Sequence, residues 1–195
     1  MGHLLVVDLE ATCWGKAGGP QTVDLMEVIE FGCVVSTWEG DIVESFSQLV
    51  RPLERPLLTD FCIKEIPITQ SMVNGAPLYA DAVARVNERL RGFDFDCWLS
   101  WGKYDRQQLA SHLERSSIAP TFLSLPHINF RDVYKRHKGS GQEAHAHGAL
   151  AACGMSWEGL QHRAEADAFN YARLIKHMSG SINEILMSGV TAPDK

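Results

Sequence analysis

The sequence predicts an α/β fold, with a mixed five-stranded sheet and helices on both faces. Three observations along the chain lead to this prediction. The N-terminal part reads as strands joined by a tight turn, which pairs them antiparallel. The middle part alternates helical patterns with short apolar strands, and the last part contains helical patterns alone. A strand hairpin followed by alternating helices and strands is typical of a sheet with helices on its two sides.

The strand predictions rest on apolar and β-branched runs. An apolar run at 4–7 reads as a buried strand, and residues 26–37 are rich in β-branched side chains. A turn at 39–41 connects this segment to the next one, so the two form a hairpin. The five predicted strands lie at 4–7, 26–37, 42–52, 97–102 and the beginning of 125–137.

The helix predictions rest on periodicity and capping. A short helix over 57–66 has Thr59 as its candidate N-cap. In the segment 77–93, apolar residues recur with a helical period and predict one buried face. Further helices are predicted at 103–116, 143–154 and 162–180, with a helical turn at the end of 125–137.

Size and composition are those of one globular domain. The chain has 195 residues, of which 45% are hydrophobic and 22% charged, enough to bury a core. We expect this domain to span residues 1–180, with residues 181–195 forming a C-terminal helix and tail.

Localisation signals are missing from the sequence pattern. The first residues lack a secretory signal, and no apolar stretch reaches the length that crosses a bilayer. The five cysteines form no CxxC pair, which is typical of reduced thiols. We therefore expect a cytoplasmic protein with no membrane partner. The net charge of -6 argues against a broad grip on duplex nucleic acid, but not against a small site that holds phosphates through metal ions.

Two acids follow the first apolar run directly. In a strand, residues two apart point to the same face, so Asp8 and Glu10 project together from one side. Neighbouring carboxylates repel each other unless they share a proton or a cation. This pair therefore predicts further ligands or a neutralising base elsewhere in the chain.

Three more polar residues stand where an α/β sheet assembles ligand sites. Asp105 follows the strand at 97–102, at the start of a helix. His162 precedes Asp167 by five residues at the head of the helix predicted at 162–180. Together with the first two acids, they make a four-acid cluster of the kind that holds hard divalent cations.

These motifs resemble the DEDDh 3′-to-5′ exonucleases of the RNase H-like fold. DLEATC resembles their first motif, SWGKYDRQQL the second, and HRAEADA the third, with His162 and Asp167 in register. The segment VIEFGCVV resembles the adjacent strand, whose glutamate is Glu30. Within the family, the chain is most similar to the Eri-type (3′ histone mRNA exonuclease-like) branch. That similarity rests on DLEATC, SQLVRPLERPLLTDFC, ITQ at 68–70 and GMSWEGLQHRAEADAFNYARLI.

The resemblance implies an exonuclease domain over 1–180 and a two-metal mechanism. Two divalent cations, Mg²⁺ or Mn²⁺, are implied at a site formed by Asp8, Glu10, Asp105 and Asp167. His162 is implied as the base that activates water. The product would be a nucleoside 5′-monophosphate released from the 3′ end.

Five further residues are candidates for substrate binding by resemblance. Ala11 and Thr12 match the family segment that passes under the terminal ribose. Trp14 and Phe61 lie in segments that resemble the nucleotide pocket, where they would stack on a base, although aromatic side chains are more often core. Glu30 would support the substrate's end or the metal shell, with a structural polar contact as the alternative.

Several functional hypotheses remain open at this stage. The leading one is an exoribonuclease acting on single-stranded RNA 3′ ends. The alternatives are a DNA 3′-to-5′ exonuclease and a non-catalytic nucleic-acid-binding module on the same fold. A weaker one is a zinc hydrolase using His145 and His147, but two helical residues so spaced point to different sides, and we expect them to be solvent-exposed. The oligomeric state is open.

Two expectations concern substrate choice. The basic stretch YKRHKGSG at 134–141 reads either as a phosphate contact or as a solvated loop. Eri-type relatives often carry a separate RNA-binding module, whereas this chain begins almost at the first catalytic strand. If the chain is complete, short or generic 3′ ends are the expected substrate.

Overall fold

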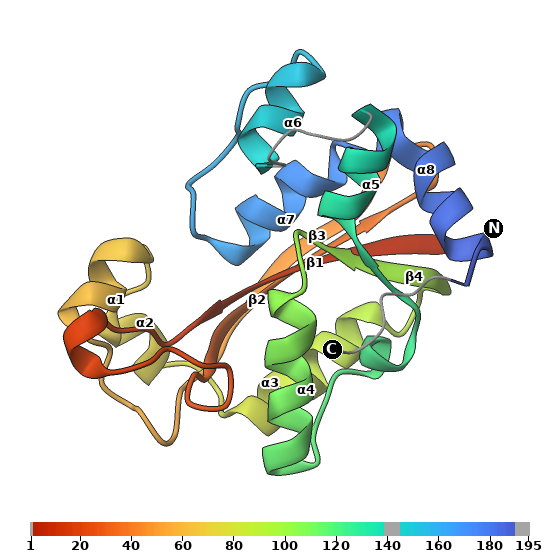
Figure 1. Cartoon of the computed structure of the whole chain (residues 1–195). Coiled ribbons are helices and arrows are strands. Elements are labelled where there is room, and N and C mark those ends of the chain that lie inside the picture. The colour runs from red at the N-terminus through yellow and green to blue at the C-terminus, as the bar shows by residue number, and fades with distance from the viewer. Residues whose placement is uncertain (1, 139–144, 190–195) are drawn as a thin grey trace.

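The protein is built on one five-stranded sheet (Figure 1). This computed structural model describes residues 2–138 and 145–189. The strand order is β3-β2-β1-β4-β5. The strands are β1 His3–Ala11, β2 Val28–Ser36, β3 Ile42–Leu49, β4 Phe95–Ser100 and β5 His127–Asn129. β2 pairs antiparallel with β1 and β3, whereas β4 pairs parallel with β1 and β5, so the predicted mixed sheet is confirmed.

Helices cover both faces of the sheet, as predicted (Figure 1). Side chains of α3 and α4 pack on one face, and side chains of α5 to α8 on the other. The helices are α1 Asp60–Glu65, α2 Gln70–Asn74, α3 Tyr79–Leu90, α4 Tyr104–Ser116, α5 Phe130–Lys138, α6 Ala146–Ala152, α7 Ala164–Ala172 and α8 Ile175–Met187. Short 3₁₀ turns, η1 Lys16–Gly18 and η2 Thr121–Ser124, lie in two connections.

The first strand separates two hydrophobic clusters. Leu4 and Val6 belong to the cluster under α5 to α8, and Leu5 and Val7 to the one under α3 and α4. Burial on both sides explains why this strand reads as a continuous apolar run rather than an alternating one. It also fixes which way the acids point, because Asp8 continues the alternation of Leu4 and Val6 toward α7.

Local sequence chemistry explains the ends and faces of two helices. The Thr59 hydroxyl accepts a hydrogen bond of 3.0 Å from the Cys62 N–H, which confirms the predicted cap of α1. On α3 the periodic apolar residues form the buried face, with Ala82, Val86 and Leu90 all in the core.

The structure corrects the helix predicted at 162–180. The chain forms two helices here, α7 and α8, with a turn at 173–174. The Leu174 N–H bonds the Tyr171 carbonyl three residues back, and this tighter turn places both Leu174 and Ile175 in the core. His162 therefore lies outside a helix, two residues before α7. The predicted domain boundary at 180 falls inside α8, which packs in the core on both sides of it.

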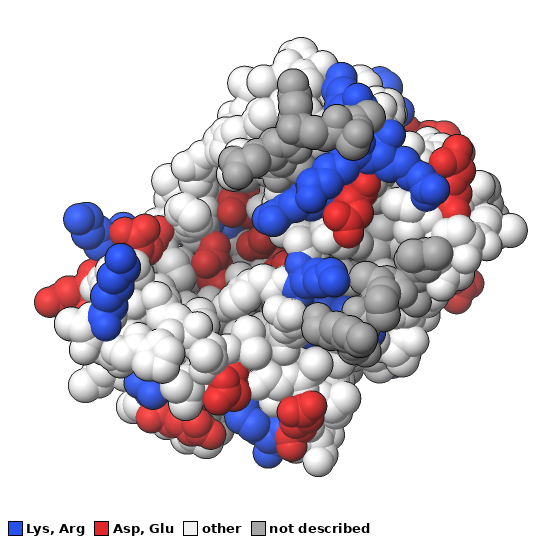
Figure 2. Space-filling view, viewed as in Figure 1, with Lys and Arg blue, Asp and Glu red and all other residues white. Residues whose placement is uncertain are grey.

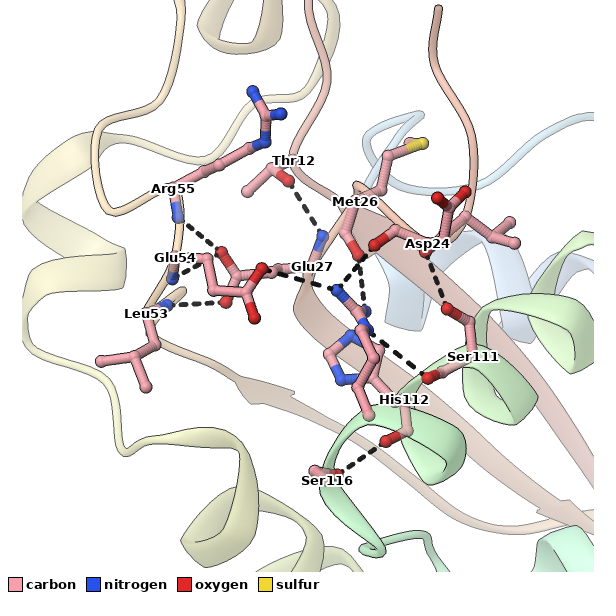
Figure 3. A network of polar contacts seen from close by, with 12 residues as sticks. Thr12, Asp24, Met26, Glu27, Leu53, Glu54, Arg55, Ser111, His112 and Ser116 are labelled. Atoms are coloured by element: carbon pink, nitrogen blue, oxygen red, sulfur yellow. Dashed lines mark hydrogen bonds and ion pairs between the residues drawn. The ribbon is translucent and has the colours of Figure 1, made fainter.

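A polar network fixes the connection between β1 and β2 (Figure 3). The Glu27 carboxylate accepts hydrogen bonds from three backbone N–H groups at 53–55, over 2.7 to 3.0 Å. The Glu27 N–H donates to the Thr12 hydroxyl over 3.0 Å. From α4, Arg115 donates to the carbonyls of Asp24 and Met26. The segment that follows the first two acids is thus held from two sides.

Along the described residues, no helix combines the length and apolarity needed to cross a membrane.

Candidate active site

The site forms where the end of β1 meets β2. Asp8 lies opposite Gly32 in the β1–β2 register, and Glu10 lies opposite Glu30. Glu10 is buried, with 9% of its surface exposed, and Asp8 is half-buried. Figure 2 shows acidic atoms recessed in a hollow of the face on which β1 and α7 meet in Figure 1.

The third acid, Asp105, lies on α4 and is hydrogen-bonded to β1. Asp105 stands in the first turn of α4 and is only 3% exposed. Its Oδ1 accepts a hydrogen bond of 2.9 Å from the N–H of Leu9, the residue between Asp8 and Glu10. The link across 96 positions of sequence brings the two predicted motifs together.

The fourth acid, Asp167, lies on α7, and His162 lies two residues before this helix. Ligand atoms of Glu10, His162 and Asp167 all lie within 4.8 Å of one another. His162 is exposed and has a φ of 58°, in the left-handed region. The structure therefore places His162 on the solvent side of two buried acids.

The approach of α7 to the sheet depends on one glycine. A Cβ at Gly32 would lie 2.0 Å from the backbone carbonyl of Ala164, the first residue of α7. Such a distance is impossible for any side chain, so only glycine lets the helix start sit directly on β2. Because Gly32 is opposite Asp8, this contact sets how near the α7 residues come to the β1 acids.

Glu30 anchors the same helix start. It is fully buried, and its two oxygens accept hydrogen bonds of 3.1 Å from Arg163 Nε; Oε1 also accepts one of 2.6 Å from Nη2. The Ala164 N–H donates to its second oxygen over 2.9 Å. These contacts agree with the structural alternative for Glu30, and a direct role in substrate binding stays a prediction.

The four acids perturb one another. Burial raises the pKa of Asp8 well above its usual range, and the nearby Asp105 and Glu10 raise it further. Burial, followed by the charge of Asp167, raises the pKa of Glu10 to about 9. Burial also raises the pKa of Asp167 to about 7 and that of Asp105 to about 6. At Asp105 backbone hydrogen bonds, including that from Leu9, act in the opposite direction.

These residues suit a divalent cation. Asp167 Oδ1 is buried and accepts no hydrogen bond from any described residue. An uncompensated carboxylate oxygen among like charges is costly, and a cation removes the cost. The carboxylate oxygens of the four acids form the donor set that hard ions such as Mg²⁺ or Mn²⁺ prefer.

The substrate candidates divide by exposure. Ala11 and Thr12 are buried, and the Thr12 hydroxyl is engaged by Glu27. Trp14 is only 4% exposed, and the Arg55 guanidinium covers its ring at 4.3 Å from the centroid, which favours packing over base stacking. Phe61 is 39% exposed and is therefore the aromatic candidate that a base can reach.

Two residues at the site were missed by sequence reasoning. Tyr104 precedes Asp105, is 37% exposed and offers a second accessible aromatic ring. Arg163 follows His162 and pairs with Glu30. Both residues are adjacent to motif residues in the sequence, which was the available signal. The sequence does not show which residues they contact.

The histidine pair of the zinc hypothesis lies at the start of α6. His145 stands at the N-cap of α6, and His147 stacks on Trp157 with ring centroids 4.2 Å apart. Both are exposed, as expected. Among the described residues, the group with metal-compatible spacing contains His162 and neither of these two.

Comparison with known proteins identifies the family. The profile of the family described as Exonuclease, of RNase T type, matches residues 5–175. The chain belongs to this exonuclease family. The probable 3′-5′ exonuclease KapD of Bacillus subtilis is 30% identical over 176 residues, which cover 89% of this chain and 82% of KapD.

Exonucleases named for RNA are also similar. The 3′-5′ exoribonuclease 1 of Mus musculus is 28% identical over 96% of this chain, and ERI1 exoribonuclease 2 of Danio rerio is 26% identical over 98%. The chain spans only 57% and 37% of these two relatives.

A solved exonuclease structure shares the whole fold. The nuclease domain of 3′hExo, a DEDDh family member bound to rAMP, has a TM-score of 0.78 and 25% identity. The match covers 98% of this chain and 95% of that one. The predicted RNase H-like exonuclease fold and DEDDh resemblance are confirmed.

Proposed function

We propose that this protein is a metal-dependent 3′-to-5′ exoribonuclease that hydrolyses single-stranded RNA ends to nucleoside 5′-monophosphates. One observation carries the proposal: ligand atoms of Glu10, His162 and Asp167 lie within 4.8 Å of one another. Asp105 is held beside them by its hydrogen bond to Leu9 of β1. Membership of the exonuclease family supports a common catalytic role for these residues.

The chemistry follows from the arrangement of the side chains. Asp8, Glu10, Asp105 and Asp167 would hold two divalent cations, Mg²⁺ or Mn²⁺, which supply positive charge to the phosphate and lower the pKa of a water. His162 is exposed beside two of these acids, where its neutral imidazole can take the proton of the attacking water. The water oxygen bonds to phosphorus and the bond from phosphorus to the 3′ oxygen of the preceding nucleotide breaks. That oxygen takes up a proton from solvent and becomes the new 3′-hydroxyl, and the terminal nucleoside 5′-monophosphate leaves.

RNA is favoured over DNA by the named relatives. The relatives from mouse and zebrafish are exoribonucleases by name, and a further similar structure, with a TM-score of 0.76, is of a 3′-exonuclease recognising a histone mRNA stem-loop. The second candidate is a DNA 3′-to-5′ exonuclease. A non-catalytic binding module would have no need to gather four acids and a histidine in one hollow.

The decisive experiment is cleavage of matched 5′-labelled RNA and DNA oligonucleotides, single-stranded and duplex. We expect a ladder that shortens from the 3′ end with Mg²⁺ or Mn²⁺, and no ladder with EDTA or in the Asp8→Ala variant. Faster cleavage of DNA would replace the ribonuclease proposal by the second candidate. No cleavage of any strand by a folded, metal-binding protein would refute both.

A cytoplasmic location is part of the proposal. The five cysteines are all unpaired, which suits a reducing compartment. Fractionation of cells expressing the tagged chain would test it, and recovery outside the cytoplasm would contradict it.

A further inference from the structure

A row of basic side chains lies beside the acidic hollow. We call it the basic ridge and define it by Lys103, Arg131, Lys135 and Lys138, all of which are exposed. Figure 2 shows Lys and Arg atoms over the region where Figure 1 places α5, on one side of the recessed acids. The chain as a whole has a net charge of -6, so this local excess of positive charge runs against its average.

Sheet topology places the ridge next to the site. Ser100, at the end of β4, pairs in parallel with Asn129 at the end of β5. Lys103, at the N-cap of α4, and Arg131, in the first turn of α5, therefore lie at the same edge of the sheet. A Cβ at Gly102 would lie 3.6 Å from the Arg131 guanidinium, so Arg131 lies over the turn that leads into α4. The first turn of α4 contains Asp105.

Helix geometry aligns the rest of the ridge. Arg131, Lys135 and Lys138 are spaced four and three residues apart, so they lie on one face of α5. The orientation of the helix is fixed, because Phe130, Val133 and Tyr134 are buried in the core. With a rise of about 1.5 Å per residue, the three positions extend over roughly 10 Å.

The ridge charges are not neutralised by nearby acids. Within 2–138 and 145–189, no carboxylate oxygen lies within 4.0 Å of a ridge nitrogen. Asp132 on the same helix instead accepts from Asn129, and Arg136 is directed away, toward Glu184 of α8 at 3.9 Å. The predicted basic stretch at 134–141 is thus partly included in the ridge, and its residues 139–141 lie outside the described residues.

We propose that the basic ridge binds the phosphates of single-stranded nucleic acid just 5′ of the terminal nucleotide. The inference rests on the proposed exonuclease function, because it takes the acidic hollow as the position of the 3′ end. A hollow lined with carboxylates repels a polyanion, and a file of cations at its edge offsets this repulsion for the incoming strand. Lys and Arg at regular helical spacing contact the backbone without reading bases, so the ridge accepts any sequence.

The test compares two triple variants with the same change in charge. The ridge variant is Arg131→Ala/Lys135→Ala/Lys138→Ala. The control variant, Arg51→Ala/Arg85→Ala/Arg91→Ala, removes three exposed cations from the segment after β3, from α3 and from the C-cap of α3, away from the ridge. Steady-state cleavage is measured for single-stranded RNA of about twelve nucleotides and for a dinucleotide, between about 50 and 200 mM salt.

The ridge predicts a length-dependent loss of affinity. For the long RNA we expect KM to rise about tenfold in the ridge variant, with a far smaller change for the dinucleotide. The slope of log affinity against log salt should fall by about 2, since each single-strand phosphate contact contributes about 0.7. The control variant should match the wild type in both respects.

Two results would overturn the inference. Equal losses in ridge and control variants would show a general charge effect, and equal losses for the long RNA and the dinucleotide would show damage to the site itself. Failure of the proposed function is a separate result, namely no cleavage by the wild type. In that case fluorescence anisotropy with labelled RNA still decides whether the ridge variant alone loses binding.

Discussion

Breaking the ion pair between Glu30 and Arg163 should destabilise the protein strongly. Glu30 is fully buried, and three of its four hydrogen bonds come from Arg163. In the Arg163→Leu variant the carboxylate would keep only the Ala164 N–H. Losing one partner of a buried pair costs about 3 to 5 kcal/mol, because the remaining charge is buried without compensation.

The lower end of that range applies here. The Arg163 side chain is 28% exposed, so water can reach part of the space that it leaves. We expect a loss of about 3 kcal/mol in the free energy of unfolding, which for a chain of this size lowers Tm by about 10 °C. Urea unfolding of wild type and variant, at a pH where both are folded, measures the difference directly.

Two matched variants separate the charge from the packing. Arg163→Lys keeps the charge but loses the planar fork that contacts both oxygens, so its loss should be intermediate. Glu30→Met/Arg163→Leu removes both charges and should recover most of the stability. The reasoning is refuted if Arg163→Leu loses less than about 1 kcal/mol, or if the double variant is as unstable as the sum of the single changes.

Three further outcomes are expected. Mg²⁺ should raise Tm, and by more at pH 8 than at pH 6. The reason is that the pKa values of Asp105, Asp167 and Glu10, about 6, 7 and 9, leave more of the metal-free site protonated at the lower pH. A pH-independent shift of Tm in calorimetry would contradict this. Gly32→Ala should cost at least about 2 kcal/mol and most of the activity, since its Cβ would meet the Ala164 backbone; unchanged urea unfolding would show that α7 can move away freely. Phe61→Ala should raise KM for RNA with little change in Tm, whereas Trp14→Ala should mainly lower Tm; the reverse result would exchange their assignments.

The sheet was predictable because its strands carry strong local patterns. The apolar run at 4–7 and the β-branched segment at 26–37 both became central strands. The division of 162–180 into two helices was not predictable, because both parts have helical periodicity and the turn at 173–174 serves to bury Leu174. That burial depends on the sheet and on α5, which are distant in sequence.

Part of the site was likewise predictable from the sequence, and part was not. The motif spacing predicted the five catalytic candidates, and the structure brings Glu10, His162 and Asp167 together. The partners that hold them are set by tertiary contacts, as in the link from Leu9 to Asp105. The sequence singles out Glu30 only by resemblance and Arg163 not at all, and only the folded chain shows that these residues, 133 positions apart, meet.

The raised pKa values of the site carboxyls also explain why the fold needs the contacts at Gly32 and Glu30. A carboxyl group whose pKa is higher in the folded protein binds more protons when folded, so stability falls as pH rises from the unfolded value near 4 toward the folded one. For Asp105, Asp167 and Glu10 that interval ends at about 6, 7 and 9, so the metal-free site opposes folding at neutral pH. The β1 and α7 acids would separate if the backbone allowed it. The close contact at Gly32 and the Glu30 ion pair oppose that separation, and so keep the acids near one another before a cation arrives.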